Sequence, residues 1–138
     1  MLKTRLIHPE LLAALAQAGH GAQVLIADGN YPYSTRLGQD TPLTYLNLAP
    51  GLVSVEQVLD VLLDAVTVEA AAVMVPDAGQ ATPEIHGRFR ESLGGGVDLD
   101  GLSRDEFYAA AQSDNVVLAV ATGEQRTYAN LLITIGVA

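Results

Sequence analysis

The sequence of 138 residues contains no cysteine, and only 5% of its residues are aromatic. Without cysteine the chain has no disulfide framework, no thiolate nucleophile and no thiolate metal ligand. Basic residues are also scarce, because seven Lys and Arg stand against 16 Asp and Glu and give a formal net charge of −9. Nucleic acid is therefore not an expected partner, since a phosphate backbone requires a cationic surface.

Long hydrophobic runs are absent as well, although 49% of the residues are apolar and only 17% are charged. No run is long enough to span a bilayer, so no membrane partner is expected. The segment Met1–His8 carries two positive charges, but no apolar run of signal-peptide length follows it, and a cytoplasmic location is the expectation. A small chain with surplus apolar residues is expected to bury some of them against copies of itself.

Four segments carry helix signals. Two are opened by capping boxes, in which a serine and the Gln or Glu three residues later bond each other's backbone: Ser54 with Gln57, and Ser103 with Glu106. The other two have proline at the start, at positions 9 and 83. These signals predict helices over residues 9–18, 54–66, 83–93 and 103–111.

Five short apolar segments predict strands, over residues 24–27, 43–48, 68–75, 116–121 and 131–135. Val24–Ala27 is apolar throughout, which is typical of a strand covered on both faces in an α/β sheet. No repeat, linker or low-complexity segment interrupts the pattern. The length suits one domain, so residues 1–138 are expected to form a single α/β domain.

The segment Gly19-His20-Gly21 lies between the first predicted helix and the first buried strand. An imidazole exchanges protons near neutral pH, and flanking glycines let a substrate approach closely, so His20 is a candidate acid/base group. The alternative is an exposed loop histidine after a helix-ending glycine.

Asp28 ends the first buried strand, where ligands of open α/β sheets usually bind. Its two carboxylate oxygens suit a pair of sugar hydroxyls, although Asp-Gly-Asn is also an ordinary turn. Tyr128 and Asn130 both donate and accept hydrogen bonds, or else belong to a loop with a packing tyrosine. Arg104 stands at a helix start, which favours anions, so it faces either a ligand or solvent.

Other kinds of site have weak support. The three histidines, at positions 8, 20 and 86, form no His-x-x-x-His pair, so no metal site is expected. Gly94-Gly95-Gly96 has no Gly-Lys-Ser/Thr continuation and is not a phosphate-binding loop. No serine stands in a Gly-x-Ser-x-Gly elbow.

Several short motifs occur in a fixed order along the chain: His8-Pro9-Glu10-Leu11-Leu12, Ala18-Gly19-His20-Gly21, Ala27-Asp28-Gly29-Asn30-Tyr31-Pro32, Phe107-Tyr108, Ala121-Thr122-Gly123-Glu124 and Tyr128-Ala129-Asn130-Leu131. In this combination the sequence resembles the D-ribose pyranase and L-fucose mutarotase family. The resemblance covers nearly the whole chain and is weakest over residues 34–44. It implies a ribose pyranase-like fold, a single three-layer domain whose central, mostly parallel sheet is flanked by helices.

Within that family the chain resembles the fucose mutarotase branch more than the ribose branch. The Gly-His-Gly and Ala-Asp-x-Asn-aromatic-Pro strings favour it, and Arg104 stands where fucose enzymes typically have arginine and ribose enzymes histidine. Two positions depart from the usual fucose pattern, Ala22 and Gly29. These departures leave the preferred sugar open.

The resemblance also implies residue roles. His20 would be the acid/base group, Asp28 and Arg104 would contact sugar hydroxyls, and Tyr128 and Asn130 would line the site together with the backbone of Ala129. Interconverting anomers requires a proton to leave the anomeric hydroxyl and another to reach the ring oxygen, so two proton-transfer groups suffice. His20 is a candidate donor to the ring oxygen, and Tyr128 or a carboxylate-bound water is its candidate counterpart. No cofactor and no metal are implied.

A distance estimate bears on assembly. If residues 22–28 form a strand at roughly 3.3 Å per residue, His20 and Asp28 of one chain lie about 20 Å or more apart. One monosaccharide cannot touch both, so we expect a site shared between neighbouring subunits, with His20 from one and Asp28 and Tyr128 from the next. The ring-shaped oligomers of the family, octamers or decamers with sites at subunit boundaries, are similar to this arrangement.

The leading hypothesis is a mutarotase or pyranase that acts on free L-fucose, D-ribose or a related monosaccharide. A noncatalytic sugar-binding or transport-accessory protein is the alternative. Binding alone needs hydroxyl partners such as Asp28 and Asn130 but has no need of a proton-transfer group at His20. A third possibility is a structural ring without a site, against which the polar residues in loops argue only weakly.

Overall fold

Helices and strands alternate along most of the chain. The computed structural model describes all residues from 1 to 138. None of its helices combines the length and apolar character that crossing a membrane requires. In chain order the elements are α1 (Pro9–Gln17), β1 (Gln23–Ala27), β2 (Leu43–Tyr45), α2 (Val55–Leu63), β3 (Val68–Met74), α3 (Glu84–Leu93), β4 (Asp98–Leu102), α4 (Arg104–Ala111), β5 (Val116–Ala121) and β6 (Leu131–Ile135).

Both predicted capping boxes are confirmed. The Ser54 hydroxyl accepts a hydrogen bond from the Gln57 backbone N–H, and the Gln57 side chain accepts one from the Ser54 N–H, which fixes the start of α2. Ser103 and Glu106 do the same for α4. Each box satisfies backbone donors that a helix start otherwise leaves unpaired. The first residue of α4, Arg104, is therefore held in a defined place.

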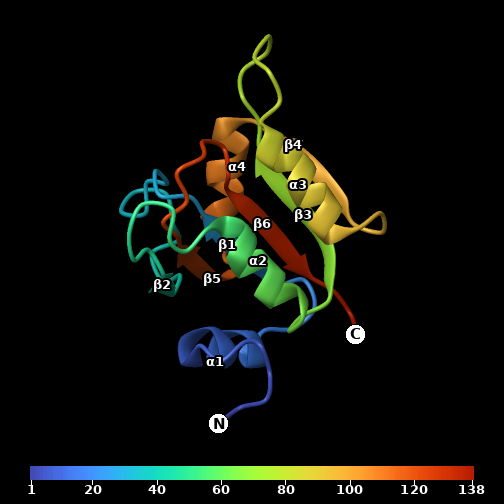
Figure 1. The fold of residues 1–138 in the computed structure, drawn as a ribbon. Coiled ribbons are helices and arrows are strands. Elements are labelled where there is room, and N and C mark those ends of the chain that lie inside the picture. Colours follow the sequence, from blue (N-terminus) through green and yellow to red (C-terminus); the bar gives the residue numbers. More distant parts are fainter.

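The six strands form one sheet in the order β2-β5-β1-β6-β3-β4 (Figure 1). β6 is antiparallel to both of its neighbours, and every other pairing is parallel. The sheet is thus mostly parallel, as expected. Five strands end at one edge of the sheet, which we call the carboxyl edge, and β6 begins there. The other edge, where β6 ends, is the opposite edge.

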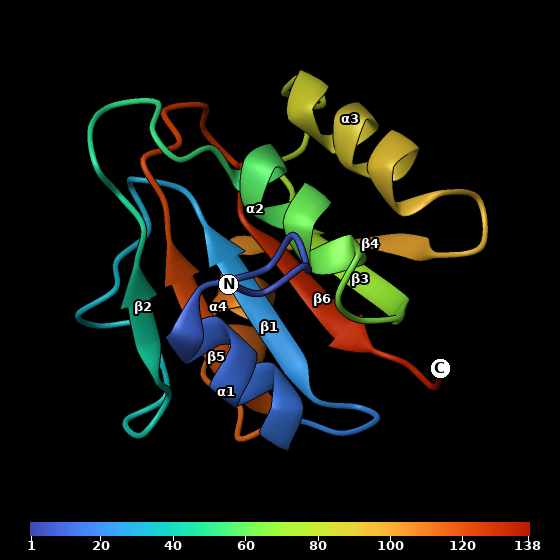
Figure 2. The same ribbon diagram turned by 60° about the horizontal axis from the view of Figure 1, so that its bottom comes forward.

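Helices cover both faces of the sheet, so the three-layer prediction is confirmed. Figure 2 shows α1, α2 and α3 on one face and α4 on the other. The larger core lies under the first three helices and includes Leu11, Leu59, Phe89 and Ile133. A smaller core lies under α4, where Phe107 packs with buried strand side chains and with the loop that follows β1.

Two strand predictions were incomplete. β4 was not predicted, because its sequence, Asp-Leu-Asp-Gly-Leu, contains residues that are depleted in strands. It forms because its backbone pairs with β3 at the rim of the sheet, where its aspartates face solvent. β2 ends at Tyr45, earlier than the expected residue 48, because the chain then turns into a loop in which Ala49 pairs with Leu52.

Candidate functional site

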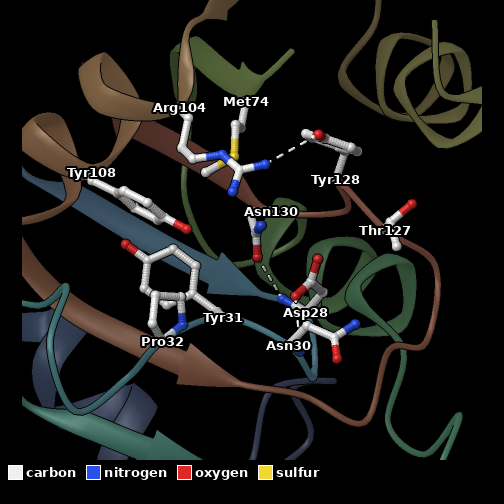
Figure 3. A pocket seen from close by; sticks show the side chains of 10 residues that line it. All are labelled: Asp28, Asn30, Tyr31, Pro32, Met74, Arg104, Tyr108, Thr127, Tyr128 and Asn130. Atoms are coloured by element: carbon white, nitrogen blue, oxygen red, sulfur yellow. Dashed lines mark hydrogen bonds between the residues drawn. The ribbon is translucent and has the colours of Figure 1, made fainter. Parts of the chain in front are cut away.

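A polar pocket opens at the carboxyl edge of the sheet (Figure 3). Its volume is about 270 Å³, slightly below the roughly 300 to 1,000 Å³ of pockets for drug-sized ligands, so it suits a small molecule. The loops after β1 and before β6, the end of β3 and the start of α4 supply its walls. The lining residues are Asp28, Asn30, Tyr31, Pro32, Met74, Arg104, Tyr108, Thr127, Tyr128 and Asn130.

Asp28 follows β1 directly and is buried, with 3% of its surface exposed. The backbone N–H of Asn30 donates to its Oδ1 at 3.0 Å, and that of Ala129 donates to its Oδ2 at 3.3 Å. Burial raises the pKa of Asp28 above its ordinary value, and the two N–H donors oppose that rise. Each carboxylate oxygen keeps a further acceptor position, so the group can hold two hydroxyls.

The loop before β6 is tied to Asp28 at successive residues. The Asn130 side-chain oxygen accepts a hydrogen bond from the Asp28 backbone N–H at 2.7 Å. Ala129 is fully buried, and its N–H is directed at the Asp28 carboxylate. Tyr128 has a left-handed backbone with a φ of 58°, and its ring borders the pocket (Figure 3). Pocket-lining groups from two distant parts of the chain are thereby fixed against each other.

Arg104 and Tyr108 reach the pocket from α4, one helical turn apart. An Arg104 Nη2 N–H donates to the Tyr128 hydroxyl at 3.3 Å. Tyr108 meets Tyr31 edge to face, with ring centroids 5.7 Å apart and an interplanar angle of 76°. The pocket thus combines a carboxylate and a guanidinium with aromatic rings, which suits a ligand with both hydroxyl and C–H groups.

The buried carboxylate of Glu124 anchors the loop of residues 122–130 to the start of α2. The Glu124 side chain, 5% exposed, accepts hydrogen bonds from the Arg126 guanidinium and from the Val55 N–H at the start of α2. Arg126 also donates to Glu56 at 2.7 Å. The Arg126 guanidinium holds the pKa of Glu124 below its ordinary value, so the carboxylate stays charged near neutral pH. These contacts hold the loop in the position that forms the pocket wall.

His20 lies at the opposite edge of the sheet and does not line this pocket. The next residue, Gly21, donates its N–H to the carbonyl of Ile135, the last residue of β6. The His20 side chain is 60% exposed, and its Nε2 lies 3.0 Å from Glu69 Oε2. The five residues of β1, roughly 17 Å of extended chain, separate the His20 loop from Asp28.

The whole chain, residues 1–138, matches the model of the RbsD / FucU transport protein family. The chain belongs to this family. A D-ribose pyranase from Paracidovorax citrulli is 34% identical over 141 residues, which cover 99% of this chain and 98% of that protein.

Two solved structures of the RbsD / FucU family's fold are similar over almost their full length. Bacillus subtilis RbsD complexed with D-ribose has a TM-score of 0.84 at 26% identity and covers 100% of this chain and 99% of its own. Fucose mutarotase from Streptococcus pneumoniae in complex with L-fucose has the same TM-score at 29% identity and covers 99% of both chains. Similarity therefore extends to both branches, and the fucose branch stays a prediction.

For this member of the RbsD / FucU family, the structure brings four of the predicted site residues together. Asp28, Arg104, Tyr128 and Asn130 line the pocket, and Ala129 lies behind it. His20 is separate. The other lining residues were not predicted as site residues: Asn30, Tyr31, Pro32, Met74, Tyr108 and Thr127. Helical spacing could have found Tyr108, four residues after Arg104, and the end of β3 could have indicated Met74.

The lining residues are suited to hydrogen bonding rather than to metal ligation. No three His, Asp or Glu side chains lie in an arrangement that could hold a metal ion. The acceptors are the Asp28 carboxylate and side-chain amide oxygens, and the donors are the Arg104 guanidinium, the phenols and the Asn130 amide. This set can bind and orient a polyol and can assist proton transfer at a hydroxyl.

Proposed function

We propose that the chain is a monosaccharide mutarotase or pyranase, in which residues 1–138 act as one domain. The observation that carries the proposal is the pocket at the carboxyl edge, where Asp28, Arg104 and Asn130 meet beside tyrosine rings. A relative is named D-ribose pyranase, and similar structures hold D-ribose or L-fucose, which supports a free sugar as the substrate.

Sugar binding follows from the hydrogen-bonding capacity of the pocket. Asp28 accepts from two hydroxyls, because each of its oxygens has one acceptor position left beside its backbone N–H. Arg104 donates to a third hydroxyl from the other side of the pocket, since its only side-chain partner is the Tyr128 phenol at 3.3 Å. The Tyr31 and Tyr108 rings contact the C–H face of the sugar.

The reaction needs two coupled proton transfers. A base takes the proton of the anomeric hydroxyl while an acid protonates the ring oxygen, so that the bond between the anomeric carbon and the ring oxygen breaks and a carbonyl forms. The carbonyl group then rotates, and both transfers reverse as the ring closes. His20 serves as the acid at the ring oxygen, and the Tyr128 phenol or a water held by Asp28 serves at the anomeric hydroxyl.

The site is completed between two protomers of a homo-oligomer, a ring of eight or ten subunits. Within one protomer the pocket lacks a histidine, whereas His20 is exposed at the opposite edge, beyond the full length of β1. A neighbour that presents its His20 to this pocket supplies the missing proton-transfer group. Large apolar side chains that are exposed in the protomer are available for such contacts, among them Ile7, Tyr45, Leu48 and Leu52.

L-Fucose is the preferred sugar in this proposal. The reason is Arg104, which takes the position typical of arginine in the fucose branch and reaches the pocket from the start of α4. The guanidinium offers several donors in a fixed plane, so it selects a sugar by the orientation of its hydroxyls.

Exchange NMR of free sugars tests the function. L-Fucose, D-ribose and D-galactose are measured with the wild-type protein and with His20→Ala, and magnetisation transfer between the anomers gives the rate. We expect faster exchange with the wild type, strongest for L-fucose, and loss of the enhancement with His20→Ala. No enhancement for any sugar would favour a noncatalytic binding protein, and enhancement that survives the substitution would remove His20 from its role.

A further inference from the structure

Tyr128 is the one residue other than glycine whose backbone is left-handed, with a φ of 58°. Side chains with a Cβ rarely adopt this conformation, and it persists only where the surroundings hold it. Tyr128 also borders the pocket and receives a hydrogen bond from Arg104. The strained backbone of Tyr128 therefore lies at the pocket, and contacts with the rest of the structure have to maintain it.

The contact that holds the Tyr128 backbone comes from His86 on α3. His86 Nε2 lies 2.8 Å from the Tyr128 carbonyl oxygen. A carbonyl can only accept, so Nε2 carries the proton and donates it. His86 is buried, with 1% of its surface exposed, and its ring stacks on Phe89 at a centroid distance of 6.3 Å. The imidazole is thus fixed in one orientation beneath the loop.

The protonation state of His86 is consistent with the hydrogen bond that Nε2 donates to the Tyr128 carbonyl. Burial lowers its pKa, the Arg90 charge acts in the same direction, and the bond to the Tyr128 carbonyl opposes both. The ring is therefore neutral near neutral pH. A neutral ring has one N–H, and that N–H is committed to Tyr128.

The hydrogen bond acts on the part of the loop that forms the pocket wall. The Tyr128 carbonyl belongs to the peptide that leads into Ala129, whose N–H donates to the Asp28 carboxylate. Asn130, one residue further, accepts from the Asp28 backbone. A change in the direction of the Tyr128 carbonyl would therefore move the phenol and both of these contacts together.

We propose that His86 is a positioning residue of the sugar site: by holding the Tyr128 carbonyl from α3, it keeps the Tyr128 phenol and the Ala129–Asn130 backbone in the binding arrangement. The inference rests on the proposed function for its effect on turnover. Its effect on the position of Tyr128 is independent of any reaction. His86 itself does not line the pocket.

Three substitutions of His86 separate positioning from packing. His86→Leu removes the donor and keeps an apolar side chain, His86→Gln keeps an N–H near the place of Nε2, and His86→Asn keeps an amide that is too short to reach. Ile85→Val is the matched control, because Ile85 is the buried neighbour on α3 and has no contact of this kind. The Tyr128 ring is observed by ¹³C–¹H NMR without sugar, assigned with Tyr128→Phe, and kcat and KM are measured by exchange NMR.

We expect His86→Leu and His86→Asn to shift the Tyr128 resonances and to lower kcat about a hundredfold, the cost of a misplacement of about 1 Å. His86→Gln should restore the resonances and most of kcat, and Ile85→Val should change neither. Wild-type resonances and wild-type kcat in His86→Asn would overturn the inference, and so would a loss in Ile85→Val equal to that in His86→Leu. If His86→Leu fails to fold, the Asn and Gln pair decides the question.

Failure of the proposed function can be distinguished from failure of the positioning role of His86. If the wild type accelerates no sugar, the function is wrong, whereas the positioning role is still decided by the Tyr128 resonances. A shift in His86→Asn that His86→Gln reverses supports positioning even then. Unshifted Tyr128 resonances reject it.

Discussion

The two edges of the sheet differ in how firmly their polar side chains are held. At the carboxyl edge, Asp28 is 3% exposed and accepts from two backbone N–H groups, and Asn130 is 5% exposed and accepts from a third. At the opposite edge, the side chains of His20 and Glu69 are 60% and 42% exposed and contact each other. The polar side chains of one edge are held by contacts within the protomer, and those of the other edge are open to solvent.

In the proposed function, this difference assigns sugar binding to one edge of the sheet and proton transfer to the other. The Asp28 carboxylate is buried and cannot move without breaking its two backbone hydrogen bonds, so in the proposed function the carboxyl edge holds the sugar. An exposed imidazole can meet a surface of another protomer, because little of it is covered within its own. We propose that each site unites the two kinds of edge across a subunit boundary.

The largest expected effect is that of His20→Asn. Removing a positioned acid/base group should lower kcat by about 10² to 10⁴ and leave sugar affinity unchanged, because the binding groups lie at the other edge. Exchange NMR gives kcat, and a sugar titration gives Kd. His8→Asn is the control, since His8 is the N-cap of α1 and Asn is a good N-cap. A weaker Kd in His20→Asn would contradict the division of roles.

Asp28→Asn should weaken sugar binding, whereas His20→Asn should slow the reaction. A hydrogen bond to a charged group contributes about 1.5 to 3 kcal/mol, so Kd for the sugar should rise about ten- to a hundredfold. Titration calorimetry measures the change, and thermal unfolding checks that the variant folds. Asp40→Asn, at an exposed position, should leave Kd unaltered. Unchanged affinity in Asp28→Asn would mean that the pocket is not the binding site.

A smaller effect is expected at Glu69. Glu69→Ala removes the acceptor that lies 3.0 Å from His20 Nε2, so the imidazole loses its orientation and kcat should fall about tenfold. Glu69→Gln keeps an acceptor oxygen and should recover most of the loss. The comparison of kcat for the two variants tests the orienting role, which is rejected if Ala and Gln behave alike.

The smallest effect concerns stability below neutral pH. Burial lowers the pKa of folded His86 below its ordinary value of 6.5. The unfolded chain therefore takes up the proton first as the pH falls below about 6.5, and the free energy of unfolding decreases. One group can contribute at most about 1.4 kcal/mol per pH unit, and its contribution ends below the folded pKa.

Urea unfolding at about pH 7.5 and about pH 5.5 measures this contribution against His86→Gln, which keeps a donor and does not titrate. We expect the wild type to lose more stability between the two values than the variant does. All other titratable groups are present in both proteins, so their contributions cancel. Equal losses would contradict the assignment of the pH dependence to His86.

The fold was predictable where local signals and tertiary packing agree. Capping boxes at Ser54 and Ser103 fixed two helix starts, and apolar runs indicated five strands. β4 could not be found this way, because its aspartates face solvent at the rim and its stability comes from pairing with β3. Edge strands depend on a neighbour that the local sequence does not reveal.

The candidate site was predictable for residues at strand and helix ends. Asp28 and Arg104 stand where the chain enters or leaves a regular element at the carboxyl edge. His86 was not predictable, because its role depends on a contact with Tyr128, 42 positions away along the chain. The ion pair between Glu124 and Arg126 was not predicted for a related reason. Its effect on the loop depends on the hydrogen bond that Glu124 accepts from the Val55 N–H at the start of α2.

Complementation between the two edges tests the shared site most directly. His20→Asn and Asp28→Asn are co-expressed with different affinity tags, and mixed oligomers are purified through both tags. If each site takes His20 from one protomer and Asp28 from the next, random assembly makes about one quarter of the sites intact, and activity should recover to about that fraction of the wild type. Mixed oligomers that show only the low activity of the two separate variants would contradict the account.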